Sequence, residues 1–87
     1  MEALSQIVAD NVRFYRNRLK FTQADLAAAT GIHRPNISRL ERGTLDFRLS
    51  TLSRIAEGLQ VPVKALLDES RIAYILLPEE SETVGEQ

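Results

Sequence analysis

The sequence contains no cysteine and a single histidine, His33. Without cysteine the chain forms no disulfide and no thiolate metal site, which is compatible with a reducing cytoplasm. The lone histidine has no second histidine at helical spacing, and no paired carboxylates lie on a predicted rigid face. We therefore expect no enzyme activity, no metal and no cofactor.

Long apolar runs are also missing. No segment approaches the roughly 20 apolar residues of a membrane-spanning helix. The N-terminal stretch "MEALSQIVADN" carries two acids and no unbroken apolar core, so it does not resemble a signal peptide. The chain has 87 residues, 44% of them hydrophobic, which suits one small domain with a core. We expect a soluble cytoplasmic protein without a membrane partner.

Neither sign of charge dominates, because the formal net charge is only −1. The charges are nevertheless segregated along the chain. Residues 13–54 contain nine basic and three acidic residues, a net charge of +6, whereas residues 55–87 contain two basic and seven acidic residues, a net charge of −5. This asymmetry is expected of a polyanion-binding surface beside a solvated end. Charge alone leaves an ordinary charged surface as an equal alternative.

Apolar spacing predicts a series of short helices. Apolar residues recur at helical spacing from Leu4 to Leu19, which predicts one long amphipathic helix. Thr22 can cap a second helix, which is rich in alanine and ends at Gly31. A third helix is predicted over residues 34–42, where a proline in the first turn is tolerated.

The second half of the domain is also predicted to be helical. Leucine, isoleucine and alanine at helical spacing predict a fourth helix over residues 52–59. The stretch "VPVKALL", residues 61–67, predicts a short fifth helix. The expected fold class is therefore all-α, with five helices in a domain that spans residues 1–69.

The composition changes after Ser70. The run "RIAYILL", residues 71–77, is apolar after its first residue, and its length and composition favour a strand over a helix. Residues 79–87 are acidic and have little to bury, so we expect a disordered tail there. We interpret residues 70–78 as a dimerisation segment between the domain and this tail.

The second and third helices are predicted to pack as a helix-turn-helix. An apolar seam joins them through Leu26, Ile32, Ile37 and Leu40. With this seam facing inward, helical spacing places the following residues on the outer arc of the third helix: Arg34, Pro35, Asn36, Ser38, Arg39 and Arg42. Arginine can bond bidentately to the major-groove edge of guanine, and asparagine to that of adenine.

The text "TQADLAAATGIHRPNISRLERG", followed by "LSTLSRIAEGLQVPVKALL", resembles the lambda-repressor-like, Cro/XRE-type helix-turn-helix family of bacterial and phage regulators. The resemblance covers residues 12–67, about two-thirds of the chain. It implies a five-helix DNA-binding domain and a transcriptional regulator, either a repressor or an autoregulator. It also implies a palindromic operator in double-stranded DNA as the partner.

The resemblance assigns roles to individual residues. Gln23 matches a residue that bonds a DNA phosphate and braces the third helix. Glu41 matches an acid that forms a partly buried ion pair with an arginine of the first helix, here Arg16. The residues that we predict to contact DNA are Thr22, Gln23, Arg34, Pro35, Asn36, Ser38, Arg39, Arg42 and Arg48.

Three residues depart from the pattern of the family. His33 stands where a small hydroxyl residue usually caps the third helix, and histidine is a poorer cap. Lys20 stands where glycine is frequent, so we expect the first turn to differ. Pro35 has no amide or side-chain donor, so we expect it to touch a thymine methyl group or the sugar–phosphate backbone.

We also predict a homodimer. The five helices account for a complete domain, so the apolar run after Ser70 has no place in the core of one monomer. Its residues can pair antiparallel with their own copy in a two-fold interface, and those that we expect there are Ile72, Tyr74, Ile75, Leu76 and Leu77. The alternative is that the run folds back over the first and fifth helices of its own chain.

A second function remains open at this point. The same fold serves in antitoxins or adaptors that mainly hold a partner protein. Such a protein would not need the basic outer arc of residues 34–42, and this arc favours DNA binding.

Overall fold

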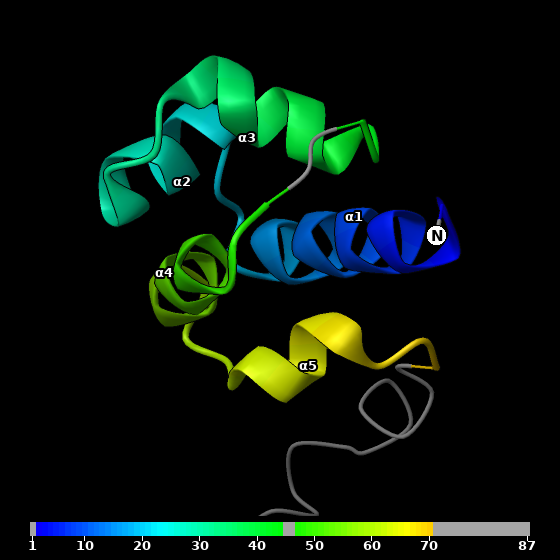
Figure 1. Ribbon diagram of the computed structural model, residues 1–87. Coiled ribbons are helices and arrows are strands. Elements are labelled where there is room, and N and C mark those ends of the chain that lie inside the picture. The colour runs from blue at the N-terminus through cyan, green and yellow to red at the C-terminus, as the bar shows by residue number, and fades with distance from the viewer. Residues whose placement is uncertain (1, 45–46, 71–87) are drawn as a thin grey trace, which may run out of the picture.

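Five α-helices make up the described part of the computed structural model, which covers residues 2–44 and 47–70 (Figure 1). No strand occurs among these residues, so the all-α prediction is confirmed. The predicted strand of residues 71–77 and the acidic tail of residues 79–87 lie outside them. The helices are α1 (Glu2–Arg18), α2 (Gln23–Thr30), α3 (Arg34–Glu41), α4 (Leu49–Leu59) and α5 (Val63–Leu67).

Helix α1 crosses the middle of the molecule. In Figure 1, α2 and α3 lie on one side of it, α5 lies on the other, and α4 packs near its C-terminal end. Its apolar stripe faces the core, because Val8, Val12 and Tyr15 are at most 5% exposed. Leu4 was expected on this stripe but is 48% exposed, since it lies in the first turns of the helix, beyond the buried core residues. None of the described helices is long and apolar enough to cross a membrane.

Helix α2 has well-formed ends. The Thr22 hydroxyl accepts a hydrogen bond from the backbone N–H of Asp25 at 2.9 Å, and the Asp25 carboxylate accepts one from the backbone N–H of Thr22 at 2.8 Å. This capping box satisfies two N–H groups that the helix itself leaves without partners. At the other end Gly31 adopts a left-handed φ of 75°. Both helix ends were predicted, but the reciprocal role of Asp25 was not.

Among the residues that the structure describes, two that are not glycine adopt a left-handed backbone. Lys20 has a φ of 60° in the turn after α1, and Gln60 has a φ of 65° at the end of α4. A side chain makes this conformation unfavourable, and glycine is the usual occupant. Lys20 therefore adopts the backbone conformation that glycine would take in this turn, so the difference expected there is not seen at this residue. The lysine side chain adds conformational strain at this position instead.

The C-terminal end of the described chain is attached to α1 by one buried amide. The Asn11 side chain is fully buried, and its Nδ2 donates to the carbonyl oxygens of Leu66 and Asp68 at 2.8 Å each. Helix α5 has only five residues, too few to be stable as an isolated helix. These two hydrogen bonds satisfy carbonyl groups that the end of α5 leaves without helical donors.

We expect Asn11→Ala to lower the free energy of unfolding by about 2–3 kcal/mol, because two carbonyl groups lose their donor in a buried place. Asn17→Ala is the matched control, since Asn17 is exposed on the same helix and gains the same helix propensity. Urea denaturation followed by circular dichroism measures both variants. Equal midpoints for the two variants would show that the buried amide contributes nothing.

Candidate nucleic-acid interface

A bidentate ion pair attaches α3 to α1. Arg16 Nε lies 2.6 Å from Glu41 Oε2, and Arg16 Nη2 lies 3.0 Å from Glu41 Oε1. The Arg16 side chain is 14% exposed and that of Glu41 only 4%, so the pair is shielded from water. Arg16 Nη1 also donates to the Phe21 carbonyl oxygen at 2.7 Å. One guanidinium therefore joins α1, the turn that follows it and α3.

Gln23 contacts the same carboxylate. Its Nε2 donates to Glu41 Oε1 at 3.1 Å, so the first residue of α2 is braced against α3. The neighbouring Thr22 hydroxyl is engaged in the capping box of α2. The resemblance implied the ion pair of Arg16 with Glu41 and, separately, a bracing role for Gln23, and the structure brings these three residues together.

The inward face of α3 is apolar and its outward face is cationic. Ile37 is fully buried and Leu40 is 2% exposed, as the predicted seam requires. The four exposed residues of the outward face are Arg34, Pro35, Arg39 and Arg42, whereas Asn36 and Ser38 are half-buried.

Contacts within the outward face are local. Arg42 Nη1 donates to Ser38 Oγ at 2.7 Å, and Arg39 Nη1 lies 3.4 Å from Asn36 Oδ1. Within the described chain the Arg34 side chain has no hydrogen bond or ion pair. We call such a guanidinium group uncommitted, because all of its N–H donors lack a partner among the described residues.

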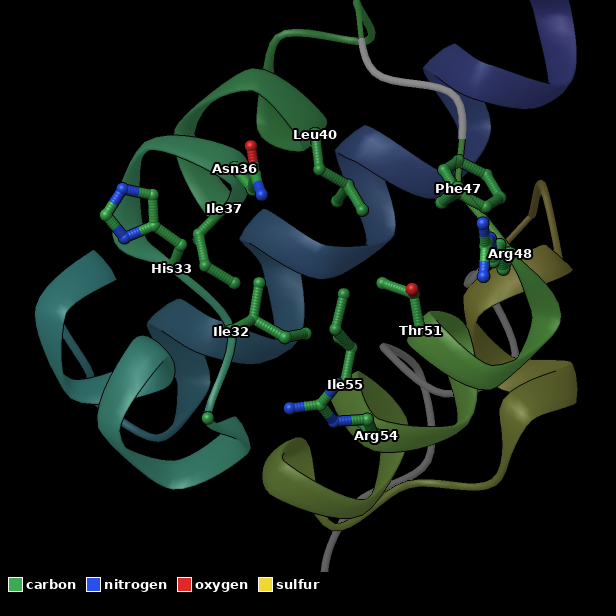
Figure 2. Close-up of a pocket in the computed structure, with 11 residues that line it drawn as sticks. Ile32, His33, Asn36, Ile37, Leu40, Phe47, Arg48, Thr51, Arg54 and Ile55 are labelled. Carbon is green, nitrogen blue, oxygen red and sulfur yellow. The ribbon is translucent and has the colours of Figure 1, made fainter.

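Helix α3 stands between two hollows of about 320 Å³ each. The first lies on the α2 side and is lined by Gln23, Arg34, Pro35 and Ser38. The second lies between α3 and α4, and Figure 2 shows the side chains that line it. The helix is therefore a ridge with space along both flanks.

The hollow on the α4 side has an apolar floor and a basic rim (Figure 2). Ile32, Ile37 and Ile55 point into its centre, and Arg48 and Arg54 lie at its edge. None of the described residues that line it is acidic. Arg48, at the N-cap of α4, has no side-chain hydrogen bond or ion pair with the described residues. This hollow favours an anionic neighbour.

The N-terminal end of α3 has no side-chain cap. His33 occupies the N-cap position and makes no capping hydrogen bond, as expected of a histidine there. Instead the Thr30 hydroxyl accepts from the backbone N–H of Ile32 at 3.2 Å, which orders the turn before α3.

Three comparisons with known proteins agree on the family. A model of the helix-turn-helix family matches residues 12–66. Control protein C.SmaI from Serratia marcescens is 41% identical over 64 residues, which cover 74% of this chain and 76% of that protein. The chain belongs to the helix-turn-helix family, of the Cro/XRE type. It is a DNA-binding transcriptional regulator.

Solved structures of similar proteins fit this regulator closely. A hypothetical transcription factor NHTF from Neisseria has a TM-score of 0.78 at 28% sequence identity, over 87% of this chain and 88% of that one. A mutant of the restriction-modification controller protein C.Esp1396I has a TM-score of 0.71 at 30% identity, over 84% of this chain and 91% of that one.

Sequence reasoning missed two arginines that organise the helix-turn-helix of this regulator. Arg54 of α4 donates from Nε and Nη2 to the Thr30 carbonyl oxygen at 3.2 and 2.9 Å, which caps the end of α2. Arg13 of α1 donates to the Glu41 carbonyl oxygen at the end of α3. Both were counted only as positive charge, and no local sequence signal distinguishes an arginine that caps a distant helix.

We expect Glu41→Ala to destabilise the regulator in the absence of DNA. Removing this carboxylate leaves the shielded Arg16 charge unpaired, at a cost of about 3–5 kcal/mol. For a domain of this size, that cost lowers Tm by more than about 10 °C.

Glu57→Ala is the matched control, because Glu57 is an exposed acid of α4. Differential scanning calorimetry compares the two variants with the unchanged protein. A Glu41→Ala Tm within a degree or two of the Glu57→Ala value would contradict a stabilising role for the ion pair.

Proposed function

We propose that this regulator reads a specific DNA sequence by inserting α3 into the major groove. The observation that carries the proposal is the shape and charge of α3, a cationic ridge between two hollows. A helix that enters a groove needs room on both flanks for the sugar–phosphate backbones that border the groove. The ridge meets that requirement within the described residues.

The outward residues divide into two groups by their proposed partners. Arg34, Asn36 and Arg39 have donors suited to base edges, and Pro35 offers an apolar contact to a thymine methyl group or to the sugar. The groups proposed to contact phosphates or to flank them are Thr22, Gln23, Ser38, Arg42 and Arg48. Gln23 and Arg48 line the opposite hollows, so they flank the ridge on its two sides.

The electrostatic field of the protein favours phosphate groups on both flanks of α3. Gln23 begins α2 and Arg48 precedes α4, and a helix N-terminus carries partial positive charge. Arg34 and Arg48 are uncommitted, so DNA binding does not require them to break an ion pair with the described chain. The net charge of −1 opposes binding little, because the positive charge is concentrated on the face that meets DNA.

We further propose that the regulator binds a palindromic site as a homodimer. One small domain contacts few bases, whereas two copies of α3 about 34 Å apart read successive turns of the same groove. The apolar run of residues 71–77 supports a self-complementary interface, and Leu67, just before it, is 40% exposed on α5. The residues proposed for this interface are Ile72, Tyr74, Ile75, Leu76 and Leu77.

The regulated genes are proposed from the similar proteins. C.SmaI is a control protein, and C.Esp1396I is a controller protein of restriction and modification. We propose that this chain likewise controls genes of a restriction–modification system, its own gene among them. A gel shift at several salt concentrations on the DNA upstream of its own gene tests the autoregulatory part of this proposal. Binding no tighter than to unrelated DNA would exclude autoregulation through that segment.

We expect Arg39→Ala to lose about 1–3 kcal/mol of binding free energy on the preferred site and to relax the base preference at one position. Arg42→Ala, three residues on, is the matched comparison. It is expected to weaken binding to all sequences similarly and to flatten the salt dependence, because a phosphate contact is lost. Fluorescence anisotropy with single-base variants of the site measures both effects. An Arg39→Ala protein with unchanged affinity and base preference would contradict the assigned reading face.

We expect the full chain to be a dimer at micromolar concentration and the chain truncated after Glu69 to be a monomer. The truncation removes the whole apolar run and therefore the proposed two-fold contact. Light scattering gives both masses, and circular dichroism checks that the helices remain. A truncated chain that stays dimeric would place the interface on the helices instead. A full chain that is monomeric would favour the run folding back over its own α1 and α5.

A further inference from the structure

The carbonyl groups at the C-terminal end of α3 need donors from outside the helix. Those of residues 38–40 accept hydrogen bonds from the backbone N–H groups of residues 42–44, at 3.0 to 3.2 Å. The fourth, the carbonyl group of Glu41, accepts from the Arg13 guanidinium of α1. Arg13 therefore completes the end of α3 from a different helix.

Arg13 is itself held in place by its neighbours on α1. Its Nη2 lies 2.5 Å from Asp10 Oδ1, and that oxygen also accepts a hydrogen bond from Gln6 Nε2 at 2.9 Å. The same Gln6 side chain lies close to Gly43, in the turn after α3. A Cβ atom placed on that glycine would be only 2.9 Å from Gln6 Oε1. The chain Gln6–Asp10–Arg13 thus follows one face of α1 and meets the end of α3 at two places.

The exposure of this chain limits what it contributes to stability. The Asp10 and Arg13 side chains are 39% and 41% exposed, so water screens their ion pair. Exposed pairs contribute little to the free energy of unfolding. By contrast, the Arg16–Glu41 pair one turn along α1 is shielded. Both arginines therefore hold Glu41 of α3, but Arg16 loses more of its hydration than Arg13 does.

Two attachments define an orientation that one attachment does not. Arg16 holds only the side chain of Glu41, and rotatable bonds separate that carboxylate from the backbone of α3. Arg13 holds the backbone carbonyl group of the same residue, so it fixes the backbone of the last turn more directly than the carboxylate contact does. Arg39 and Arg42 belong to this last turn, so their direction depends on the backbone that Arg13 fixes.

We propose that Arg13 is a positioning residue for sequence recognition, acting through the Glu41 carbonyl group to orient the last turn of α3. Arg13 does not contact DNA in this proposal, and its effect is on the bases that Arg39 reads. The proposal rests on the proposed insertion of α3 into the major groove. It assigns to α1 a part in specificity that is separate from its part in the core.

The test measures the ratio of two dissociation constants. The first is for the double-stranded site that the unchanged protein selects from a random library, and the second is for random-sequence duplex of the same length. We expect Arg13→Ala to reduce this specificity ratio about tenfold, with the lost preference concentrated at the base pairs that Arg39→Ala also affects. Arg13→Lys keeps the positive charge and an N–H donor. We therefore expect its specificity ratio to lie between those of Arg13→Ala and the unchanged protein.

Two further variants make the test decisive. Lys64→Ala removes an exposed cation on α5, so it controls for the loss of positive charge and should leave the ratio unchanged. Asp10→Asn keeps the guanidinium but weakens its anchor, and it should lower the ratio in the same base positions even if Arg13→Ala does not fold. Circular dichroism at the assay temperature checks that each protein is folded.

The outcomes separate the inference from the function on which it rests. A consensus site for the unchanged protein, with ratios lowered at the Arg39 positions in the Arg13→Ala or Asp10→Asn variant, supports the inference. Unchanged ratios in both, or a loss spread equally over all base positions, would overturn it and leave the proposed function intact. Failure of the unchanged protein to select any site would overturn the proposed function and the inference with it.

Discussion

The buried carboxylate of Glu41 is the constraint on which the helix-turn-helix depends. A buried charge is tolerated only when a partner charge and hydrogen bonds replace the water that it has lost. Arg16 supplies two of those hydrogen bonds and Gln23 a third, and these donors come from α1 and α2. Satisfying this one carboxylate thus joins α1, α2 and α3, in addition to the apolar core that they share.

The same requirement separates the two faces of α3. Its buried face is used for the apolar seam and for Glu41, so its cations can only face outward. Arg34 and Arg48 then remain without partners in the described chain, although the chain carries more acids than bases. The observed separation by chain segment leaves them available to a polyanion.

Helix ends are completed by side chains from other helices. Arg54 caps α2, Arg13 caps α3, and Asn11 holds the carbonyl groups at the end of α5. Helices of five to eight residues have too few internal hydrogen bonds to be stable alone. These long-range caps make each short helix depend on the helix that completes its end.

The local pattern of residues by itself determined the five helices, the stop at Gly31 and the inward seam of α3. The helical spacing of apolar residues, the capping of helix ends and the backbone freedom of glycine all depend on residues close together in the chain. A single sequence is therefore enough to predict them. The resemblance to a known family added the contact between Arg16 and Glu41, which lie 25 residues apart. Only the tertiary structure decided that Asn11 is buried, that Arg13 and Arg54 cap distant helices and that hollows flank α3 on both sides. These features depend on which helix ends meet in space, and a pattern of neighbouring residues carries no information about that.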